Sequence, residues 1–170
     1  MKLLRETIRR LIIESAESLD ANKLFVKALY SLPQWKPHVC PWASQSPSNE
    51  SLAFSPTPEC ELRVFLITHY DDVIEIARIE TAQEYDAENS RYIEDYNEEC
   101  EGKGYGTQCF NQLIDLADEY DVGLMLEASA YNEDPQGKRP DTAGLTAWYK
   151  RMGFEDSPQD NSMLVYNFRA

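Results

Sequence analysis

Apolar residues recur at helical spacing in two segments near the start of the chain. The first segment covers residues 1–17, and the second runs through residues 24–29. Asp20 or Asn22 can cap the second helix, and Pro33 ends it because proline lacks the N–H group that a helix interior needs. The pattern predicts a helical segment at the N-terminus, whose first helix docks on its own domain or forms a homodimer contact.

Residues 33–60 have a different composition. They hold six of the nine prolines of the chain, at positions 33, 37, 41, 47, 56 and 58, together with many serines. This composition is typical of a linker or of an extended loop that wraps around a domain. The sequence therefore predicts a helical segment over residues 1–32, a connector over residues 33–60 and a folded core over residues 61–170.

The core opens with two apolar runs of strand length. Glu61–Tyr70 is apolar on both faces, which is typical of a buried strand, and Val73–Thr81 forms a second strand after a turn at residues 71–72. Residues 83–100 then hold seven acids and one arginine. This segment is too polar for a core strand and predicts an insertion at one end of the sheet.

Helical and strand-like segments alternate in the rest of the core. Pro140 with Asp141 or Thr142 opens the second of two helices, and Gly153 ends it with a left-handed cap. The pattern predicts a helix, a strand, a helix and a last, edge-side strand, over Thr107–Tyr120, Val122–Ala130, Ala143–Met152 and Met163–Phe168.

Three glycines at alternate positions lie directly before the first of these helices, within residues 101–107. Glycine lets the backbone approach a ligand where a side chain would block it. The start of a helix offers unpaired N–H groups and a partial positive charge. The segment therefore predicts an anion site, most naturally for a phosphate or pyrophosphate, although a tight turn before a helix explains the same glycines.

The charge of the chain restricts its partners. The formal net charge is −14, and residues 61–170 carry nine Lys or Arg against twenty-four Asp or Glu. Nucleic acid is not an expected partner, because a phosphate backbone needs a basic face. The acidic field favours a cationic partner such as an amine, a polyamine or a lysine-rich tail. Solubility alone accounts for the same charge.

The remaining composition bears on compartment, thiols and metals. The sequence lacks the run of roughly 18 apolar residues that spans a membrane, and its N-terminus is charged too early for a signal peptide. We expect a cytoplasmic protein without a membrane partner. The four cysteines form no Cys-x-x-Cys pair, which predicts reduced, mostly structural thiols. His38 and Cys40 lack a second pair of ligands, so no metal site is predicted.

Two motifs in the core resemble those of the Gcn5-related N-acetyltransferase (GNAT) superfamily, whose members use acetyl-CoA. Residues 101–106 are similar to the family's Arg/Gln-x-x-Gly-x-Gly/Ala signature. Trp148 and Tyr149, followed by Gly153 and Phe154, are similar to its aromatic-Tyr pair and Gly-Phe. The resemblance implies an α/β (α+β) fold with a central mixed, mostly antiparallel sheet flanked by helices.

The resemblance covers residues 61–170, and the chain departs from the family in two places. Glu101 replaces the usual Arg or Gln. A carboxylate beside a pyrophosphate is unfavourable, so either Glu101 points away or cofactor binding is weakened. In addition, the acidic insertion separates the second strand from the glycine loop, whereas the family usually joins the two directly.

The resemblance implies acetyl-CoA as the co-substrate. Main-chain N–H groups of the glycine loop would hold its pyrophosphate, at Gly102, Lys103, Gly104, Tyr105, Gly106 and Thr107. The strand edge from Ile79 to Thr81 would pair with the pantetheine arm like an added strand. Four basic side chains are candidates for the 3′-phosphate or are only surface charges, namely Lys138, Arg139, Lys150 and Arg151.

The resemblance also implies the catalytic groups. Tyr149 matches the family's general acid for the leaving thiolate, unless it only packs against Trp148 and Phe154. Glu80, at the end of the second strand, is the first candidate for the general base, and Glu127 on the next strand is the second. The alternative role for either carboxylate is to bind the cation of the acceptor without acting as a base. A carboxylate buried beside apolar neighbours would have a raised pKa, which suits a base.

Together these features predict an N-acetyltransferase that acts on a primary amine of a cationic small molecule or of a protein. The alternative is a catalytically silent protein of the same fold that binds a partner. Residues 1–9 also resemble the opening segments of proteins from large tailed phages, where such a segment targets a protein to the capsid and is cut after Ile/Leu-x-Glu. Residues 12–14 fit such a site, which would place the protein in a virion and then in host cytoplasm.

Overall fold

The structure is a computed structural model, and it describes residues 20–38, 49–69, 72–81, 84–86, 91–93, 100, 102–130 and 140–168. The predicted first helix and the phage-like segment lie outside the described residues. None of the helices described there is long and apolar enough to cross a membrane.

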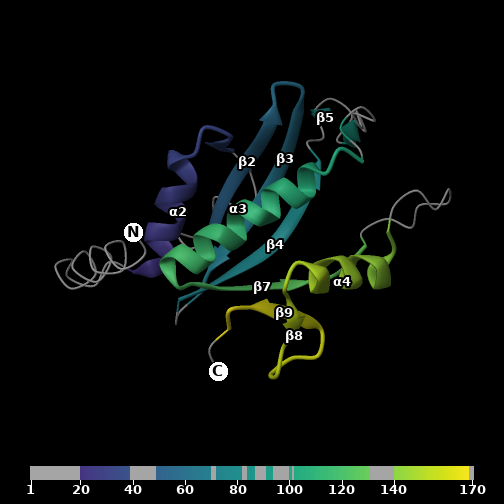
Figure 1. The fold of residues 1–170 in the computed structure, drawn as a ribbon. Helices are drawn as coiled ribbons and strands as arrows, with labels where there is room; N and C mark the ends of the chain where they lie inside the picture. Colours follow the sequence, from purple (N-terminus) through teal and green to yellow (C-terminus); the bar gives the residue numbers. More distant parts are fainter. Residues whose placement is uncertain are drawn as a thin grey trace.

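The centre of the protein is a seven-stranded sheet in the order β1-β2-β3-β4-β7-β9-β8. All neighbouring strands are antiparallel except β4 and β7, which run parallel. The strands are β1 (Trp35–Pro37), β2 (Asn49–Thr57), β3 (Cys60–Thr68), β4 (Val73–Thr81), β7 (Gly123–Glu127), β8 (Glu155–Asp156) and β9 (Met163–Tyr166). The predicted fold class, a mixed and mostly antiparallel sheet flanked by helices, is confirmed (Figure 1).

Three helices accompany this sheet among the described residues: α2 (Ala21–Ser31), α3 (Tyr105–Tyr120) and α4 (Thr142–Arg151). Their ends follow the capping residues that the sequence indicated. Asp20 accepts a hydrogen bond from Asn22 N at the start of α2, and Asp141 accepts one from Gly144 N at the start of α4. Gly153 follows α4 with φ 99°.

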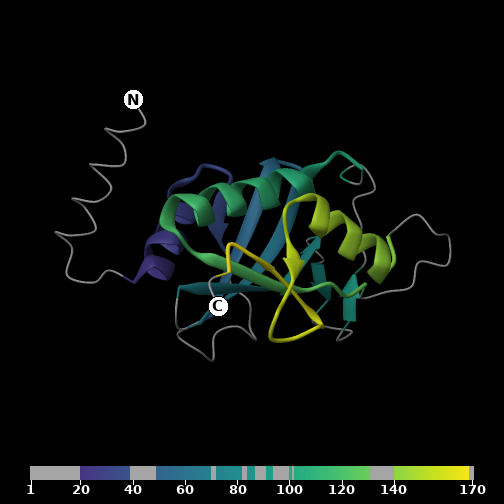
Figure 2. The ribbon, with the colours of Figure 1, turned by 60° about the horizontal axis from the view of Figure 1, so that its bottom comes forward.

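Helix α3 lies across one face of the sheet, and α4 lies near its N-terminal half (Figures 1 and 2). The apolar stripe of α3 faces the core, where Phe110, Leu113 and Ala117 are fully buried. The same core takes in α2 and the inner sides of the strands, with Phe25, Leu29, Leu52, Phe54, Val64, Leu66, Ile74, Leu124 and Leu126. Burial of these side chains fixes α3 against the sheet and so fixes where its first turn lies.

Within residues 33–60, where the composition predicted a connector, the structure has two strands, β1 and β2, of the central sheet. Two of the described prolines occupy positions where a sheet tolerates them. Pro37 ends β1, which is an edge strand, and Pro56 lies where the β2–β3 register shifts between Phe54 and Thr57. A missing N–H group costs little at an edge or at an irregularity, so proline content hid two strands.

The acidic insertion contains a small separate hairpin of β5 (Glu84–Asp86) and β6 (Arg91–Ile93). Neither of these two strands, the ones described within the segment, pairs with the central sheet. At the other end of the chain, β9 matches the predicted last strand, but β8 lies outside it and forms the edge. A two-residue strand with exposed Glu155 and Asp156 has no apolar pattern from which it could be predicted.

Candidate active site

The parallel strands β4 and β7 pair over a short distance and then separate. Their register runs only from Val73 opposite Gly123 to Glu75 opposite Met125. On its other side, β4 continues to pair with β3, and the register shift there leaves Ala77 as an extra residue. A bulge of this kind bends a strand. Beyond it, β4 leads away from β7 (Figure 1), and none of the described strands pairs with that edge of β4 up to Thr81.

The glycine loop lies at the start of α3. Gly102 has φ 69° and Gly104 has φ 76°, a left-handed conformation that glycine adopts without strain. Gly104 is the N-cap residue of α3 and offers no side chain to the first turn, which has no side-chain cap. Helix starts leave their first N–H groups without partners inside the helix. This uncapped start therefore has donors available for an anion. Glu101 lies outside the described residues.

The two glycines are exposed, and a Cβ atom built on either would meet nothing within 4 Å. Their positive φ angles, rather than crowding, require glycine in the protein without ligand. Gly106 differs, because it lies inside α3 with an ordinary helical backbone. A Cβ atom there would meet only the Trp148 ring, at 3.9 Å. Trp148 thus lies beside the glycine loop, a contact that the sequence motif did not indicate.

Tyr149 belongs to an aromatic cluster at the junction of α3 and α4. Its ring centroid lies 5.2 Å from that of Phe110, 4.9 Å from that of Trp148 and 6.0 Å from that of Phe154. None of the described residues forms a hydrogen bond with its hydroxyl group that the structure records. Tyr149 therefore makes the ring contacts with Trp148 and Phe154 that its packing role requires, and its catalytic role stays a prediction.

Burial controls the ionisation of this cluster. It raises the pKa of Tyr149 to about 12, with the neighbouring Cys109 as a smaller cause. Cys109 is itself completely buried, and burial raises the pKa of its thiol as well. Since that thiol stays neutral at ordinary pH, burial is the cause that matters for Tyr149. The phenol is protonated at neutral pH and can donate a hydrogen bond.

The two candidate bases lie near the carboxyl ends of β7 and β4. Glu127 is exposed at the carboxyl end of β7, on the strand that separates from β4. Glu80 lies near the end of β4, with its Cα atom opposite Arg63 on β3. Only backbone is described for Glu80, and the same holds for Thr81, whereas the Ile79 side chain is partly buried against the core. The roles predicted for these residues stay predictions.

Two of the four basic candidates for the 3′-phosphate lie among the described residues. Lys150 Nζ lies 2.7 Å from Asp156 Oδ2, so Lys150 is paired with β8. Arg151 is exposed, as is Lys103 in the glycine loop, and Lys138 and Arg139 lie outside the described residues. The described part of the chain brings together no group of three or more potential metal ligands.

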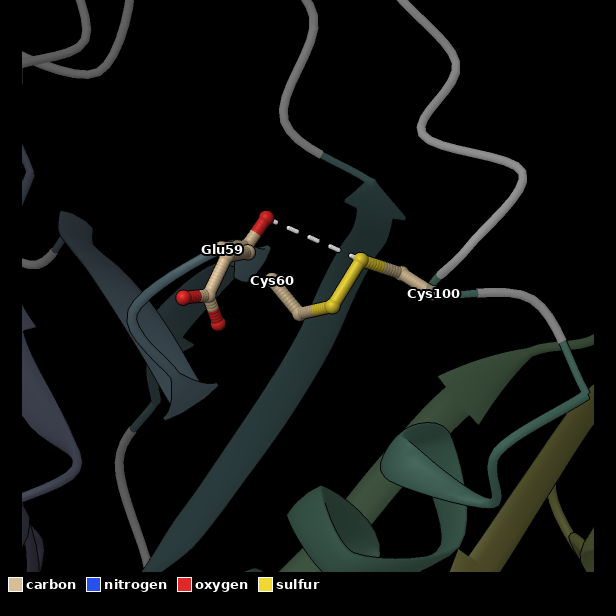
Figure 3. The surroundings of a disulfide bond; sticks show 3 residues. All are labelled: Glu59, Cys60 and Cys100. Carbon is tan, nitrogen blue, oxygen red and sulfur yellow. Dashed lines mark hydrogen bonds between the residues drawn. A yellow bond between two sulfur atoms is a disulfide. The ribbon is translucent and has the colours of Figure 1, made fainter.

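The prediction of reduced thiols is wrong for two cysteines. Cys60 and Cys100 form a disulfide, with their Cα atoms 5.7 Å apart (Figure 3). The expectation of reduced thiols rested on the absence of a Cys-x-x-Cys pair. These cysteines are 40 residues apart in sequence, and only the fold brings them together. Cys109, the described cysteine that is free, is buried as expected.

Comparisons with known proteins give distant likenesses of fold. No protein-family model matches the chain, and no curated protein matches it in sequence. Among solved structures, the anti-CRISPR protein AcrVA5 is 18% identical, with 62% of this chain and 88% of that chain covered and a TM-score of 0.41. A putative acetyltransferase of the GNAT family from Bacteroides thetaiotaomicron is 11% identical, with 88% and 82% covered and a TM-score of 0.44. With such low values, the function has to be inferred from the chain's own site.

Proposed function

We propose that this protein is an acetyl-CoA-dependent N-acetyltransferase that acts on a primary amine of a cationic molecule. One observation carries the proposal: the bulged strand β4 leaves β7 after three residue pairs and leads toward the end of the sheet at which the uncapped, glycine-led helix α3 starts (Figures 1 and 2). An unpaired strand edge and a cluster of free N–H donors are the two features that an extended pantetheine arm and a pyrophosphate need.

In this proposal, the cofactor lies across the mouth between β4 and α3. Amide groups of residues 102–107 hold the pyrophosphate, where the helix start also favours negative charge. The free edge of β4 from Ile79 to Thr81 pairs with the amides of the pantetheine arm. Lys103, exposed in the loop, adds a positive charge at the pyrophosphate. Lys150 contributes to the 3′-phosphate only if it leaves Asp156.

The reaction is a transfer of the acetyl group from sulfur to nitrogen. The neutral amine attacks the thioester carbonyl carbon, a C–N bond forms, the C–S bond breaks and the CoA thiolate leaves. The acceptor arrives as an ammonium ion, so a base must first take its proton, and Glu80 or Glu127 fills that role directly or through water. Amide groups of β4 beside the bulge polarise the carbonyl oxygen as charge develops on it.

Tyr149 serves the leaving group in this scheme. A thiol has a pKa near 8.5, so full proton transfer from a phenol whose pKa is about 12 runs uphill by roughly 3.5 pKa units. We therefore assign Tyr149 as a hydrogen-bond donor to the departing sulfur rather than as its final proton source. Formation of the amide removes two protons from the ammonium ion: the base takes one before the attack and passes it to solvent, and the other leaves the nitrogen after the C–N bond forms and ends on the CoA thiolate.

Measurement of CoA thiol release over a panel of amines tests the proposal. We expect turnover with at least one cationic amine, and calorimetry should show acetyl-CoA binding without any amine present. Acetyl-CoA binding without turnover on any amine or protein lysine favours the catalytically silent alternative. Absence of acetyl-CoA binding contradicts the proposal.

The acidic hairpin is expected to select the acceptor. The double variant Glu84→Gln/Asp86→Asn should raise the KM for a cationic amine about threefold, since surface charges contribute about 0.2–1 kcal/mol each, and salt should weaken the effect. β5 begins three residues after β4 ends, close to the proposed mouth. The matched control is Asp115→Asn/Glu119→Gln, which removes two exposed charges from α3. Equal KM values for both variants reject this selection.

A further inference from the structure

The Cys60–Cys100 disulfide joins two residues that lie next to the segments that the proposed function assigns to the cofactor. Cys60 is the first residue of β3, and Leu62, two residues later, pairs with Thr81 at the end of β4. Cys100 precedes Gly102 by two residues, so their Cα atoms lie within about 7.6 Å. The bridge, shown in Figure 3, therefore connects the start of β3, which is the partner of the free end of β4, to the residue two positions before Gly102.

Without this bridge, the two segments have a much longer connection. Along the chain, Thr81 and Gly102 are joined only through the acidic insertion of residues 82–101, whose described strands β5 and β6 pair with each other and not with the central sheet. A long excursion constrains the distance between its ends weakly, whereas a covalent cross-link removes most of that freedom. On its other side the loop is held by α3, which is anchored in the core through Phe110 and Leu113.

The loop itself can change shape easily. Gly102 and Gly104 carry positive φ angles in open surroundings, where no neighbouring atom lies near enough to restrict them. Glycine has more accessible conformations than any other residue, so a glycine loop fixed at one end only loses its preorganisation. The disulfide supplies the second fixed end.

One of the two sulfur atoms of the bridge is accessible for thiol–disulfide exchange. Cys60 is buried, with 7% of its surface exposed, while Cys100 is half-buried. Cys100 Sγ lies 3.7 Å from Glu59 O, and because a disulfide sulfur carries no proton, this is a contact rather than a hydrogen bond. An incoming thiolate therefore reaches Cys100 more readily than Cys60.

We propose that the Cys60–Cys100 disulfide is a redox control of acetyl-CoA binding. The oxidised bridge holds the glycine loop in its binding conformation, and reduction by a dithiol, either a small molecule or a redox protein, releases the loop and weakens binding. This inference rests on the proposed function, because it concerns affinity for the same cofactor. In the cytoplasm that the sequence leads us to expect, disulfides are usually of this transient, sensing kind, whereas permanent disulfides belong to oxidising compartments.

The exchange balances without any further reactant. One thiolate of the dithiol attacks Cys100 Sγ, an S–S bond forms to the reductant, and Cys60 leaves as a thiolate. The second thiol of the reductant then displaces Cys100 and closes its own disulfide. The two protons of the dithiol end on Cys60 and Cys100, and the dithiol has lost two electrons. An oxidised dithiol of the same class reverses the reaction.

The test compares acetyl-CoA affinity of the full chain in its two redox states by calorimetry. We expect the dissociation constant to rise about tenfold when dithiothreitol reduces the protein, and to return on reoxidation. Alkylation and peptide mapping follow Cys60 and Cys100 in each state, and circular dichroism confirms that the reduced protein stays folded. The variant Cys100→Ser should bind as weakly as the reduced protein and should not respond to dithiothreitol.

The outcomes separate this inference from the function it rests on. Equal affinity in both redox states overturns the redox control and leaves the acetyltransferase proposal intact. Tighter binding by the reduced protein, a bridge that resists dithiothreitol, or an oxidised protein whose two cysteines react with the alkylating agent also overturns it. An oxidised, folded protein that binds no acetyl-CoA contradicts both proposals.

Discussion

Replacement of Tyr149 by Phe is expected to lower kcat about 100-fold and to leave the acetyl-CoA dissociation constant within about twofold. The change removes one oxygen atom and keeps the ring. That ring packs against Phe110, Trp148 and Phe154, and these contacts survive in the variant. The lost group is the hydroxyl, which in our scheme acts only when negative charge develops on sulfur.

The control for this variant is Tyr166→Phe. Tyr166 touches the same cluster through Phe154, with ring centroids 5.6 Å apart, but its hydroxyl donates to Asp118 on the outer side of α3. We expect its kcat to stay within about threefold of the original, because a hydrogen bond at an exposed site has a small effect on stability and none on the site. Equal loss in both variants, or no loss in Tyr149→Phe, removes Tyr149 from the mechanism.

The pH dependence follows from the raised pKa of Tyr149. The active form is the protonated phenol, and with a pKa of about 12 instead of the ordinary 10.0 this form persists well above neutral pH. We therefore expect no loss of kcat from ionisation of Tyr149 up to the ordinary pKa of tyrosine. A fall with an apparent pKa near 10.0 that disappears in Tyr149→Phe would contradict the effect of burial.

Gly106→Glu is expected to keep the fold and to weaken acetyl-CoA binding at least tenfold. Glutamate is favoured over glycine inside a helix and is stabilising in its first turn, so the melting temperature should stay or rise. The new Cβ atom meets only Trp148, at 3.9 Å, which is an ordinary contact. In the ligand complex, however, the new carboxylate would stand where the pyrophosphate approaches the main-chain amides, and like charges repel there.

This combination separates a structural glycine from a ligand-binding one. If Gly106 is needed only for the turn or for packing, the variant loses stability together with affinity. Asn111→Glu, at an exposed position further along α3, is the matched control and should change neither property. A Gly106→Glu protein that is stable and binds acetyl-CoA at full strength shows that the amides of the first turn do not hold the cofactor.

Local signals in the sequence were sufficient for much of the core. The caps at Asp20 and Asp141 and the left-handed Gly153 depend on neighbouring residues only, and each was predictable for that reason. The glycine loop was recognised in the same way. Its predicted helix began at Thr107, two residues late, because glycine at position 106 reads as a loop residue although it lies inside α3.

Tertiary pairing was not predictable from such signals. The serines and Pro56 of β2 are typical of a connector. In the fold, however, β2 pairs with β3 on one side and β1 on the other, and Leu52, Ala53 and Phe54 are buried. The Cys60–Cys100 bridge and the contact of Trp148 with Gly106 depend in the same way on segments that are distant in sequence.

The same distinction between local signals and tertiary contacts holds for the candidate active site. Tyr149 was predictable as a residue, but its raised pKa comes from packing of α4 against Phe110 of α3, which no local pattern contains. The departure of β4 from β7 depends on an extra residue at Ala77, in a strand whose apolar pattern looks regular. Bulges arise from the competition between pairing partners, and a single strand sequence does not reveal them.

The central claim is that main-chain amides at the start of α3 bind the pyrophosphate of CoA. Titration of ¹⁵N-labelled, oxidised protein with CoA, followed by the amide resonances of residues 102–107, measures this directly. We predict large, saturable shifts for Gly104, Tyr105 and Gly106, together with smaller shifts at Ile79 to Thr81. Saturable shifts confined to other parts of the chain, or no shifts at any CoA concentration, would contradict the account.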